Sequence, residues 1–291
     1  MKNSTEQPEN DNTYFIDAES AAEMARLTGM DSMLSNSMGG LFPQHPNLTA
    51  VQDALDIACG PGAWAMEMAY TYPEMQVVGI DISKTMTRYA QAQAKVQGLD
   101  NAQFFVMDAT QPLDFPDASF DLVNARLING FMPKEAWPQS VREMMRILRP
   151  GGIMRITETD TWGISNSFAL EKMISLAVRA LFVAGRTFSP YPSSQHFGLT
   201  PMLPLFFEQA GCQQIQKQAY VLDFSAGAEI HQNNYENYRV AFKLMQPFFI
   251  KQKVATQEEL DQLYEQMLIE MMSTDFRAVG YFMSICGTKP L

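Results

Sequence analysis

The sequence predicts an α/β fold in which a seven-stranded, mostly parallel sheet carries helices on both faces. Short apolar strands alternate with helical segments from Ala54 to Asp160, which is typical of a parallel sheet covered on both sides. After Asp160 this alternation breaks, and added helical segments appear. A final apolar segment, residues 279–288, fits a strand inserted late and antiparallel.

The alternating region supplies five predicted strands and the helices between them. The strands are ALDIAC, MQVVGID, AQFFVMDA, FDLVNARL and IMRITETD. The helices cover about 63–70, 83–98 and 134–148, and Gly98 ends the second of them. A helix over 202–211 and strands over 213–224 and 279–288 resume the α/β pattern near the end.

The remaining segments divide the chain. Residues 1–13 are polar without apolar periodicity, which predicts a disordered tail. Residues 14–44 predict a helical cap with two helices, one over 17–28 with Asp17 as N-cap and one ending near Met38. We expect residues 45–291 to form the main domain, with helical lid insertions at about 161–199 and 226–275.

Composition excludes several classes of protein. The net charge of -11 argues against a broad nucleic-acid surface, although a local basic patch remains compatible with it. The three cysteines show no metal-ligand spacing, so we expect no metal site and a reducing compartment. No signal core or membrane-length apolar segment is apparent, which predicts a cytoplasmic protein without a membrane partner.

The central motif is the segment from Leu55 to Trp64, LDIACGPGAW, in which a strand runs into a glycine turn and a helix. Gly60 and Gly62 allow close approach of a ligand because they lack a Cβ atom. Asp81 ends the second strand, where a carboxylate can bind both hydroxyls of a ribose. A dinucleotide-binding turn makes the same demands, and a tight turn before a packed helix is a further alternative.

Two further motifs narrow these alternatives. Asp108 ends the third strand, where its carboxylate can accept a hydrogen bond from an adenine amino group. LRPGG, residues 148–152, predicts a turn before the fifth strand.

Together, LDIACGPGAW, VVGIDIS, FVMDA, FPDASFDLVNAR and LRPGG resemble the class I S-adenosylmethionine (SAM)-dependent methyltransferases. The resemblance is strong over about 50–160 and closest to the branch that contains the ubiquinone and menaquinone-biosynthesis enzymes. It implies a Rossmann-like fold, SAM as cofactor, S-adenosylhomocysteine as product and a small-molecule substrate. Strand four ends in NARL rather than the Asn/Asp-Pro-Pro-Tyr/Phe signature of many nucleic-acid amino methylators, which argues against a nucleobase or amide target.

The resemblance also implies roles for residues of the cofactor site. Asp81 binds the ribose, Ile82 packs on the adenine, and Asn124 lines the sulfonium end. The full set of expected cofactor-binding residues is Tyr14, Arg26, Asp56, Ala58, Gly60, Gly62, Asp81, Ile82, Met107, Asp108, Ala109 and Asn124. Of these, Arg26 is a residue-based guess as a partner for the SAM carboxylate, with a solvent-facing side chain as its alternative.

No obligatory catalytic side chain follows from these motifs. Glu158 and Asp160 end strand five, where ligands bind in open α/β sheets, so either is a candidate base. His196 and His231 in the inserted segments are candidates near neutral pH. Solvated carboxylates and surface histidines are the alternatives for these four residues.

The inserted segments are rich in aromatic residues and Met, which suits a hydrophobic or aromatic acceptor. Simple packing of the added helices explains each such residue equally well. Methylation of carbon, oxygen or nitrogen stays open, as do a role in secondary metabolism and a homo-oligomer formed through the N-terminal helical segment. The alternatives are an NAD(P)-dependent oxidoreductase, an RNA methyltransferase and a non-catalytic SAM-binding subunit.

Overall fold

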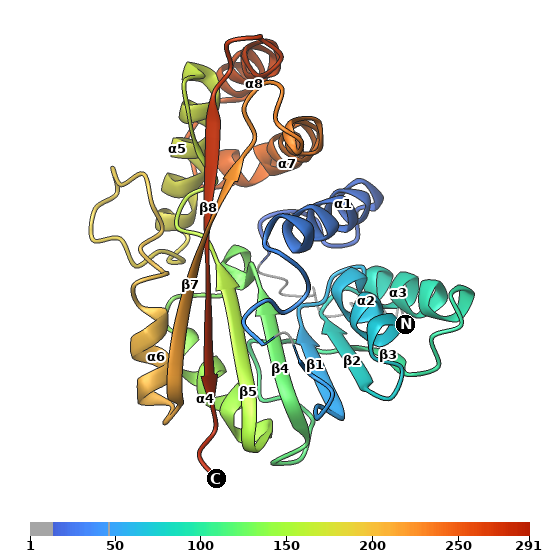
Figure 1. Ribbon diagram of the computed structural model, residues 1–291. Helices are drawn as coiled ribbons and strands as arrows, with labels where there is room; N and C mark the ends of the chain where they lie inside the picture. The colour runs from blue at the N-terminus through green and yellow to red at the C-terminus, as the bar shows by residue number, and fades with distance from the viewer. Residues whose placement is uncertain (1–13, 46) are drawn as a thin grey trace, which may run out of the picture.

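The computed structural model describes residues 14–45 and 47–291. A single sheet runs through this part of the chain. The strand order is β3-β2-β1-β4-β5-β8-β6, and β7 pairs with β8 (Figure 1). The parallel strands are β1 (Asp53–Ile57), β2 (Gln76–Asp81), β3 (Ala102–Val106), β4 (Phe120–Arg126) and β5 (Leu148–Glu158). β8 (Ala278–Thr288) runs antiparallel to β5 and to β7 (Gln213–Asp223). The predicted mostly parallel sheet with a late antiparallel strand is therefore confirmed.

Side-chain alternation along the strands creates two hydrophobic cores, one on each face. Leu55 and Val123 belong to the core that includes side chains of the helices α4 (Trp137–Ile147) and α6 (Leu203–Gln209). Their neighbours Ala54 and Leu122 belong to the core that includes α2 (Ala63–Thr71) and α3 (Lys84–Val96). Because successive strand residues point to opposite faces, apolar strands of this kind require helices on both sides.

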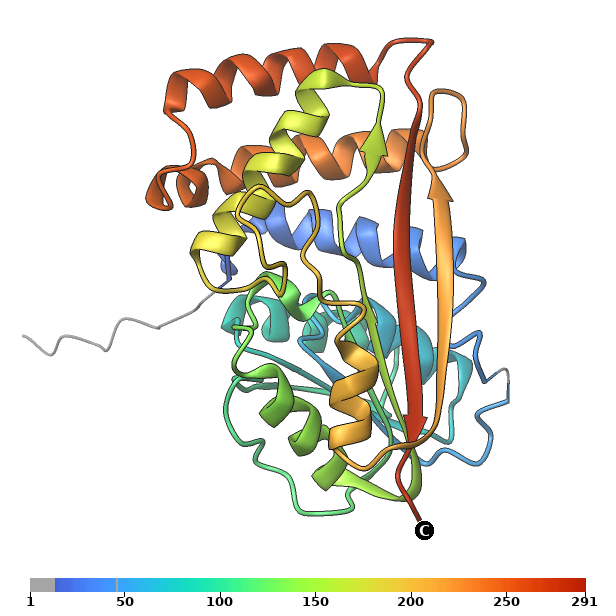
Figure 2. The same cartoon turned by 90° about the vertical axis from the view of Figure 1, so that its left-hand side faces the viewer.

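Four helices form a lid beyond the carboxyl ends of the parallel strands. They are α1 (Ala21–Ser37), α5 (Phe168–Val183), α7 (His231–Lys251) and α8 (Gln257–Met271). Figures 1 and 2 both show α1 lying between the sheet and α7. The carboxyl edge of the sheet is therefore covered by residues from the predicted cap and from both predicted insertions.

Several boundaries differ from the sequence prediction. The sheet has eight strands instead of seven, because β6 (Ile164–Ser165) pairs with β8; two residues are too few to produce a periodic pattern. One helix, α1, replaces the two predicted before Met38, and Ser20 rather than Asp17 is its N-cap. LRPGG lies inside β5, beside a register irregularity between Phe120 and Leu122 of β4. The predicted disordered tail, 1–13, lies outside the described residues.

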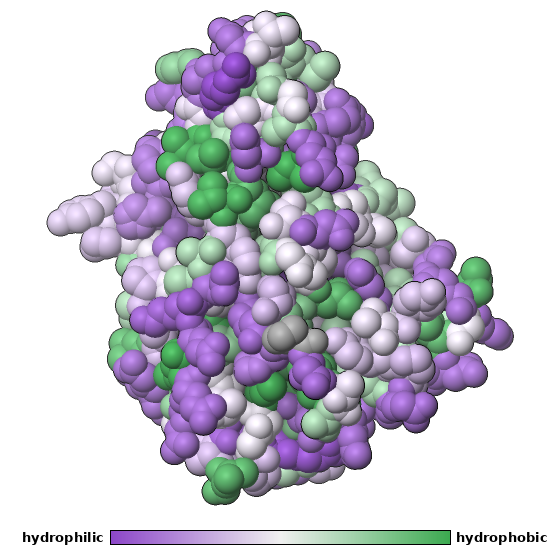
Figure 3. Space-filling view, in the orientation of Figure 1, coloured by the Kyte–Doolittle hydropathy of each residue, from purple (hydrophilic) through white to green (hydrophobic). Residues whose placement is uncertain are grey.

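The outer surface is mainly polar on the face shown in Figure 3, with an apolar group of residues over the upper part of β8 and the start of α5. Exposed apolar residues of these elements and their neighbours include Ile164, Phe168, Val221 and Tyr281. Among the described residues, no helix combines the length and apolar character needed to cross a membrane.

Candidate functional site

The turn between β1 and α2 depends on three residues with positive φ angles. Ala58 has a φ of 54°, Gly60 of 54° and Gly62 of 81°. This left-handed backbone reverses the chain within a few residues, and it is accessible to Gly at little cost. Gly62 is the N-cap of α2 and offers no side chain to the first turn of that helix.

The two glycines of the turn have different surroundings. A Cβ atom on Gly62 would lie 2.6 Å from the ring of Phe104 and 2.8 Å from Cβ of Ala90, inside the core between α3 and β3. A Cβ atom on Gly60 would meet only Leu27 Cδ1, at 3.6 Å, and both residues line the main pocket. Gly62 is therefore needed for packing, which corrects the prediction that it approaches the ligand directly, whereas Gly60 faces the pocket.

Asp81 connects the glycine turn to the end of β2. Its Oδ2 atom accepts a hydrogen bond from the backbone N–H of Gly60 at 2.9 Å, and Oδ1 accepts from Ser83 N–H at 2.8 Å. Burial raises the pKa of this carboxyl group, while the two N–H donors act in the opposite direction. The carboxylate is thus fixed in orientation, and Asp81 lines the pocket.

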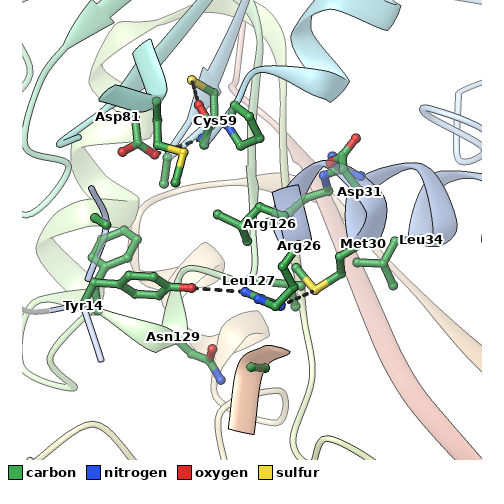
Figure 4. A pocket seen from close by; sticks show the side chains of 18 of the residues that line it. Tyr14, Arg26, Met30, Asp31, Leu34, Cys59, Asp81, Arg126, Leu127 and Asn129 are labelled. Carbon is green, nitrogen blue, oxygen red and sulfur yellow. Dashed lines mark hydrogen bonds and ion pairs between the residues drawn. The ribbon is translucent and has the colours of Figure 1, made fainter. Parts of the chain in front are cut away.

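A cavity of about 230 Å³ lies between the carboxyl ends of the parallel strands and the lid helices α1 and α7. Figure 4 shows residues from these elements around it. Ten of the twelve residues predicted for the cofactor lie in its wall: Tyr14, Arg26, Asp56, Ala58, Gly60, Asp81, Ile82, Met107, Asp108 and Ala109. Gly62 and Asn124 are the two that do not.

Asn124 lies behind the pocket wall rather than in it. It is fully buried on β4, where its Nδ2 donates to Asp56 Oδ1 at 2.7 Å and its Oδ1 accepts from Arg155 Nε at 2.7 Å. Because β4 and β1 are parallel neighbours with Asn124 opposite Asp56, the amide faces the neighbouring strand instead of the cavity. This corrects the prediction that Asn124 lines the sulfonium end.

Asp56 is the buried carboxyl group of the pocket. Burial raises its pKa to about 7, opposed by the nearby Arg126 and reinforced by the nearby Asp31. Arg126, at the end of β4, forms an ion pair with Asp31 of α1 and donates a hydrogen bond to Ser35. These charges make this part of the pocket suitable for the amino and carboxylate groups of an amino acid.

Comparison with known proteins identifies the family. A model of the methyltransferase domain matches residues 54–152. The chain is 27% identical over 187 residues to the demethylmenaquinone methyltransferase of Geobacillus kaustophilus, in a match covering 62% of this chain and 79% of that relative. It is 35% identical over 130 residues to the 27-O-demethylrifamycin SV methyltransferase of Amycolatopsis mediterranei, a match covering 45% of each chain.

Residues 54–152 therefore form a methyltransferase domain of the class I SAM-dependent type. The fold is also that of Haemonchus contortus phosphoethanolamine N-methyltransferase 2, solved with phosphomonomethylethanolamine and S-adenosylhomocysteine, with a TM-score of 0.52 and 19% identity. That similarity covers 88% of this chain and 52% of the other. The chain thus spans about half the length of the Haemonchus structure and less than half of the rifamycin relative.

The donor set of this pocket is compatible with SAM. Asp81 presents a fixed carboxylate for a ribose diol, and Asp108 is oriented by Thr110, whose N–H and hydroxyl donate to its Oδ1 at 2.8 and 2.7 Å. Ile82 and Met107 supply apolar contacts nearby, and Gly60 leaves room where a side chain would intrude.

The two carboxylate candidates for a catalytic base do not line the pocket. Glu158 is fully buried, accepts hydrogen bonds from Ile128 and Asn129 N–H at 2.6 and 3.1 Å, and has its pKa raised to about 8 by burial. Asp160 accepts from Leu199 N–H at 2.7 Å and from the hydroxyl of Thr200. Neither residue lies in the described pocket wall. Their carboxylates instead hold neighbouring loops in place through these hydrogen bonds.

The two histidine candidates also lie away from the pocket wall. His196 is exposed in the loop after α5. His231 begins α7, where its Nδ1 lies 3.0 Å from Phe224 O and its ring packs near Phe276. None of the four candidate bases therefore lies in the described pocket wall.

The lid contributes a second end of the pocket, which we call the acceptor end. It comprises the lining residues from 129, from 159–162 and from α7, namely Asn129, Thr159, Trp162, Asn234, Asn237, Tyr238, Ala241, Phe242 and Met245. Of the aromatic residues in the predicted cap and insertions, Tyr14, Phe15, Tyr238 and Phe242 line the pocket, whereas others such as Phe168 and Tyr191 are exposed.

Sequence reasoning missed several pocket residues, among them Asp31, Arg126, Asn129, Trp162 and Asn234. Arg126 and Asn129 follow β4 at the carboxyl edge, so their position was a usable signal. Nothing in the local sequence distinguishes Asn234 from the other polar residues of α7, because only its tertiary placement brings it to the pocket.

Arg26 lies in the pocket wall and joins two lid helices. It pairs with Glu23, donating from Nε and Nη2 at 2.7 and 2.6 Å, and its Nη1 donates to Asn237 Oδ1 of α7 at 2.7 Å. The Tyr14 hydroxyl donates to the same Glu23 at 2.7 Å. A contact between Arg26 and the cofactor carboxylate stays a prediction. The structure shows in addition that Arg26 links α1 to α7 through a hydrogen bond.

Proposed function

We propose that this methyltransferase transfers the methyl group of SAM to a neutral, hydrophobic small molecule with aromatic character. The observation that carries the proposal is the acceptor end, where Trp162, Tyr238, Phe242 and Met245 form an apolar wall. The described residues of the acceptor end include no Asp, Glu, Lys, Arg or His. Such a surface favours apolar rings over charged groups. The names of the demethylmenaquinone and demethylrifamycin relatives agree with this class of substrate.

We assign the cofactor end of the pocket as follows. Asp81 accepts hydrogen bonds from the ribose hydroxyls, and Asp108, with the backbone of Met107 and Ala109, binds the adenine against Ile82. Asp56, Ala58 and Gly60 surround the methionine part, with Arg26 and Tyr14 on the lid side. When bound there, SAM supplies an activated methyl group on a sulfonium.

The contribution of this chain to the reaction is to position the acceptor and to exclude water. Correct placement of two reactants lowers a barrier by about 7–11 kcal/mol, and the lid helices enclose the acceptor end for this purpose. Since no described residue of the acceptor end is a carboxylate or histidine, we expect no protein base at the reacting atom. The choice among carbon, oxygen and nitrogen acceptors is therefore left to the substrate.

The test is a methyl-transfer assay on the full chain with SAM labelled in the methyl group. We expect label to enter organic-extractable phenols, naphthols or quinols, and SAM to bind in isothermal titration calorimetry while NADH does not. Asp81→Ala should abolish SAM binding without unfolding the protein, as judged by circular dichroism. Label entering RNA, hydride exchange with NAD(P)H, or SAM binding without transfer to any compound in the panel would overturn the proposal.

Three finer predictions accompany this function. A homo-oligomer formed through residues 14–44, a cytoplasmic location and a role in secondary metabolism all stay predictions. Light scattering on the purified chain checks the first of them directly.

A further inference from the structure

Two asparagine side chains in the acceptor end have unused hydrogen-bond donors. Asn129 and Asn234 are each 5% exposed, and both line the pocket. The Nδ2 atom of each is buried, and within residues 14–45 and 47–291 neither has a hydrogen bond of standard geometry. Buried amide groups in native proteins nearly always have a partner, so two orphaned donors in one pocket point to a ligand.

Both asparagines are on well-anchored backbone. The N–H groups of Ile128 and Asn129 donate to buried Glu158, which fixes the short helix η1 (Ile128–Gly130). Asn234 lies in the first turns of α7 and donates its N–H to Ile230 O at 2.9 Å. The unused donors are therefore held in place rather than placed on freely moving loops.

The position of these donors separates them from the cofactor residues. In Figure 4, Asn129 lies beyond Tyr14 and Arg26 from Asp81, on the opposite side of the pocket. Asn234 belongs to α7, together with Tyr238, Phe242 and Met245 of the acceptor end. A ligand group that reaches the asparagines thus belongs to the acceptor and not to the ribose or adenine.

The neighbouring polar groups do not use all the N–H groups of these amides. The Tyr238 hydroxyl donates to the carbonyl oxygen of Trp162, and its oxygen faces one N–H of Asn234, which leaves the second N–H of that amide unused. The Asn237 carbonyl accepts from Arg26. Of the remaining lining residues of the acceptor end, Thr159 uses its hydroxyl to donate to backbone carbonyls, and Trp162, Ala241, Phe242 and Met245 are mainly apolar.

Resting on the proposed function, we propose that Asn129 and Asn234 bind an oxygen atom of the acceptor and thereby select its chemical class. That class is an aromatic or fused-ring compound carrying a carbonyl, phenol or hydroxyl oxygen. The amides donate to this oxygen, and the aromatic wall holds the ring. A hydrocarbon of the same shape leaves both donors unpaired and binds less well.

The test uses two probes that differ by one carbonyl oxygen, 1-tetralone and tetralin. Binding to the full chain saturated with S-adenosylhomocysteine is followed by calorimetry and by quenching of tryptophan fluorescence, since Trp162 lines the pocket. We expect tetralone to bind more tightly than tetralin. Asn129→Leu and Asn234→Leu should each weaken tetralone binding about tenfold while leaving tetralin binding unchanged or stronger.

Two further variants keep the test decisive. Asn233→Leu makes the same change at an exposed position of the same helix and should leave both affinities unchanged. Asn234→Asp, measured at pH 8, keeps the side-chain shape but removes the amide donor, and should lower tetralone affinity as the leucine does.

The possible outcomes distinguish this inference from the proposed function. Equal affinities for the two probes, absence of binding of either at 1 mM, or an unchanged tetralone affinity in both leucine variants would overturn the inference while S-adenosylhomocysteine still binds. Failure of the wild-type chain to bind S-adenosylhomocysteine would count against the proposed function instead.

Discussion

The amide of Asn124 links Asp56 in the pocket wall to Arg155 behind it, with hydrogen bonds of 2.7 Å on both sides. The guanidinium of Arg155 is itself buried, lies 4.2 Å from the centre of the Phe42 ring and donates to Leu41 O at 2.6 Å. Burial lowers the pKa of Arg155 to about 9. The orientation of the pocket carboxylate therefore depends on a polar network that contacts no ligand directly.

We expect Asn124→Ala to lower the free energy of unfolding by about 2 kcal/mol, because it leaves a buried donor of Arg155 and a buried acceptor of Asp56 unpaired. It should also weaken SAM binding by roughly tenfold, since Asp56 loses the hydrogen bond that orients it. Urea denaturation and calorimetry measure the two effects.

The matched control for this change is Asn101→Ala. The side chain of Asn101 donates to Ala69 O and Met75 O at 2.9 Å, away from the pocket wall. This control should lose stability but keep its SAM affinity. Equal losses of affinity in the two variants would mean that Asn124 acts only through general stability.

We expect alanine substitutions at the two glycines of the β1–α2 turn to differ in their effects on stability and on SAM binding. Gly62→Ala should cost about 2–3 kcal/mol of unfolding free energy, because the added Cβ overlaps the Phe104 ring. Gly60→Ala should cost about 1 kcal/mol, the value of a left-handed conformation for alanine, and should weaken SAM binding more than its stability loss explains. Thermal denaturation and calorimetry of both variants make the comparison. A larger loss of stability in Gly60→Ala than in Gly62→Ala would contradict it.

We expect the buried Glu158 to make the free energy of unfolding depend on pH. Its pKa is raised to about 8 in the folded protein by burial, so the folded state holds the proton more tightly than the unfolded state does. Its contribution is fully present below the unfolded pKa, near 4.3, and is lost as pH rises through the folded value. Between pH 5 and 8 the wild-type chain should lose at least about 1 kcal/mol from this group, the equivalent of one pKa unit.

Glu158→Gln is the variant that isolates this group. Its amide oxygen can still accept from Ile128 and Asn129, but the side chain does not titrate. Urea denaturation at pH 5 and pH 8 should therefore show a smaller decrease for the variant than for the wild type. Identical decreases would assign the pH dependence to other groups.

Replacing Arg26 alone should lower the stability of the protein more than replacing Arg26 and Glu23 together. Arg26→Ala leaves the fully buried Glu23 without its cation and should cost about 3–5 kcal/mol. The double variant Glu23→Gln/Arg26→Met removes both charges and should cost clearly less. Denaturation of the single and double variants gives the comparison, and SAM affinity is measured alongside. A double variant that regains stability but not affinity would support contact between Arg26 and the cofactor carboxylate.

Local sequence signals were sufficient for the sheet and for most of the cofactor pocket. The reason is that Gly60, Asp81 and Asp108 follow parallel strands directly, and the carboxyl ends of such strands meet at one edge. Asn124 also follows this pattern but is turned toward β1, because strand register and side-chain direction are set by neighbours across the sheet. Its misplacement shows that proximity to the edge does not fix which way a side chain points.

The two carboxylate candidates lie outside the pocket wall for a related reason. Glu158 and Asp160 lie at the expected strand end. However, their carboxylates accept hydrogen bonds from the backbone N–H groups of Ile128, Asn129 and Leu199. Those partners come from distant segments and leave no local pattern. The acceptor end depends in the same way on how α7 packs against α1, α5 and α8, which residues 231–251 alone do not reveal.

The central position of β8 has a consequence for how the chain folds during synthesis. β8 is made after β7, yet it lies between β7 and β5 in the sheet, so β7 has no partner until β8 emerges. The lid helices α7 and α8 lie between these two strands in the sequence, so they leave the ribosome before the sheet is complete. We therefore expect the cofactor half to form first on the growing chain, and the substrate-selective half to acquire its structure in one late step.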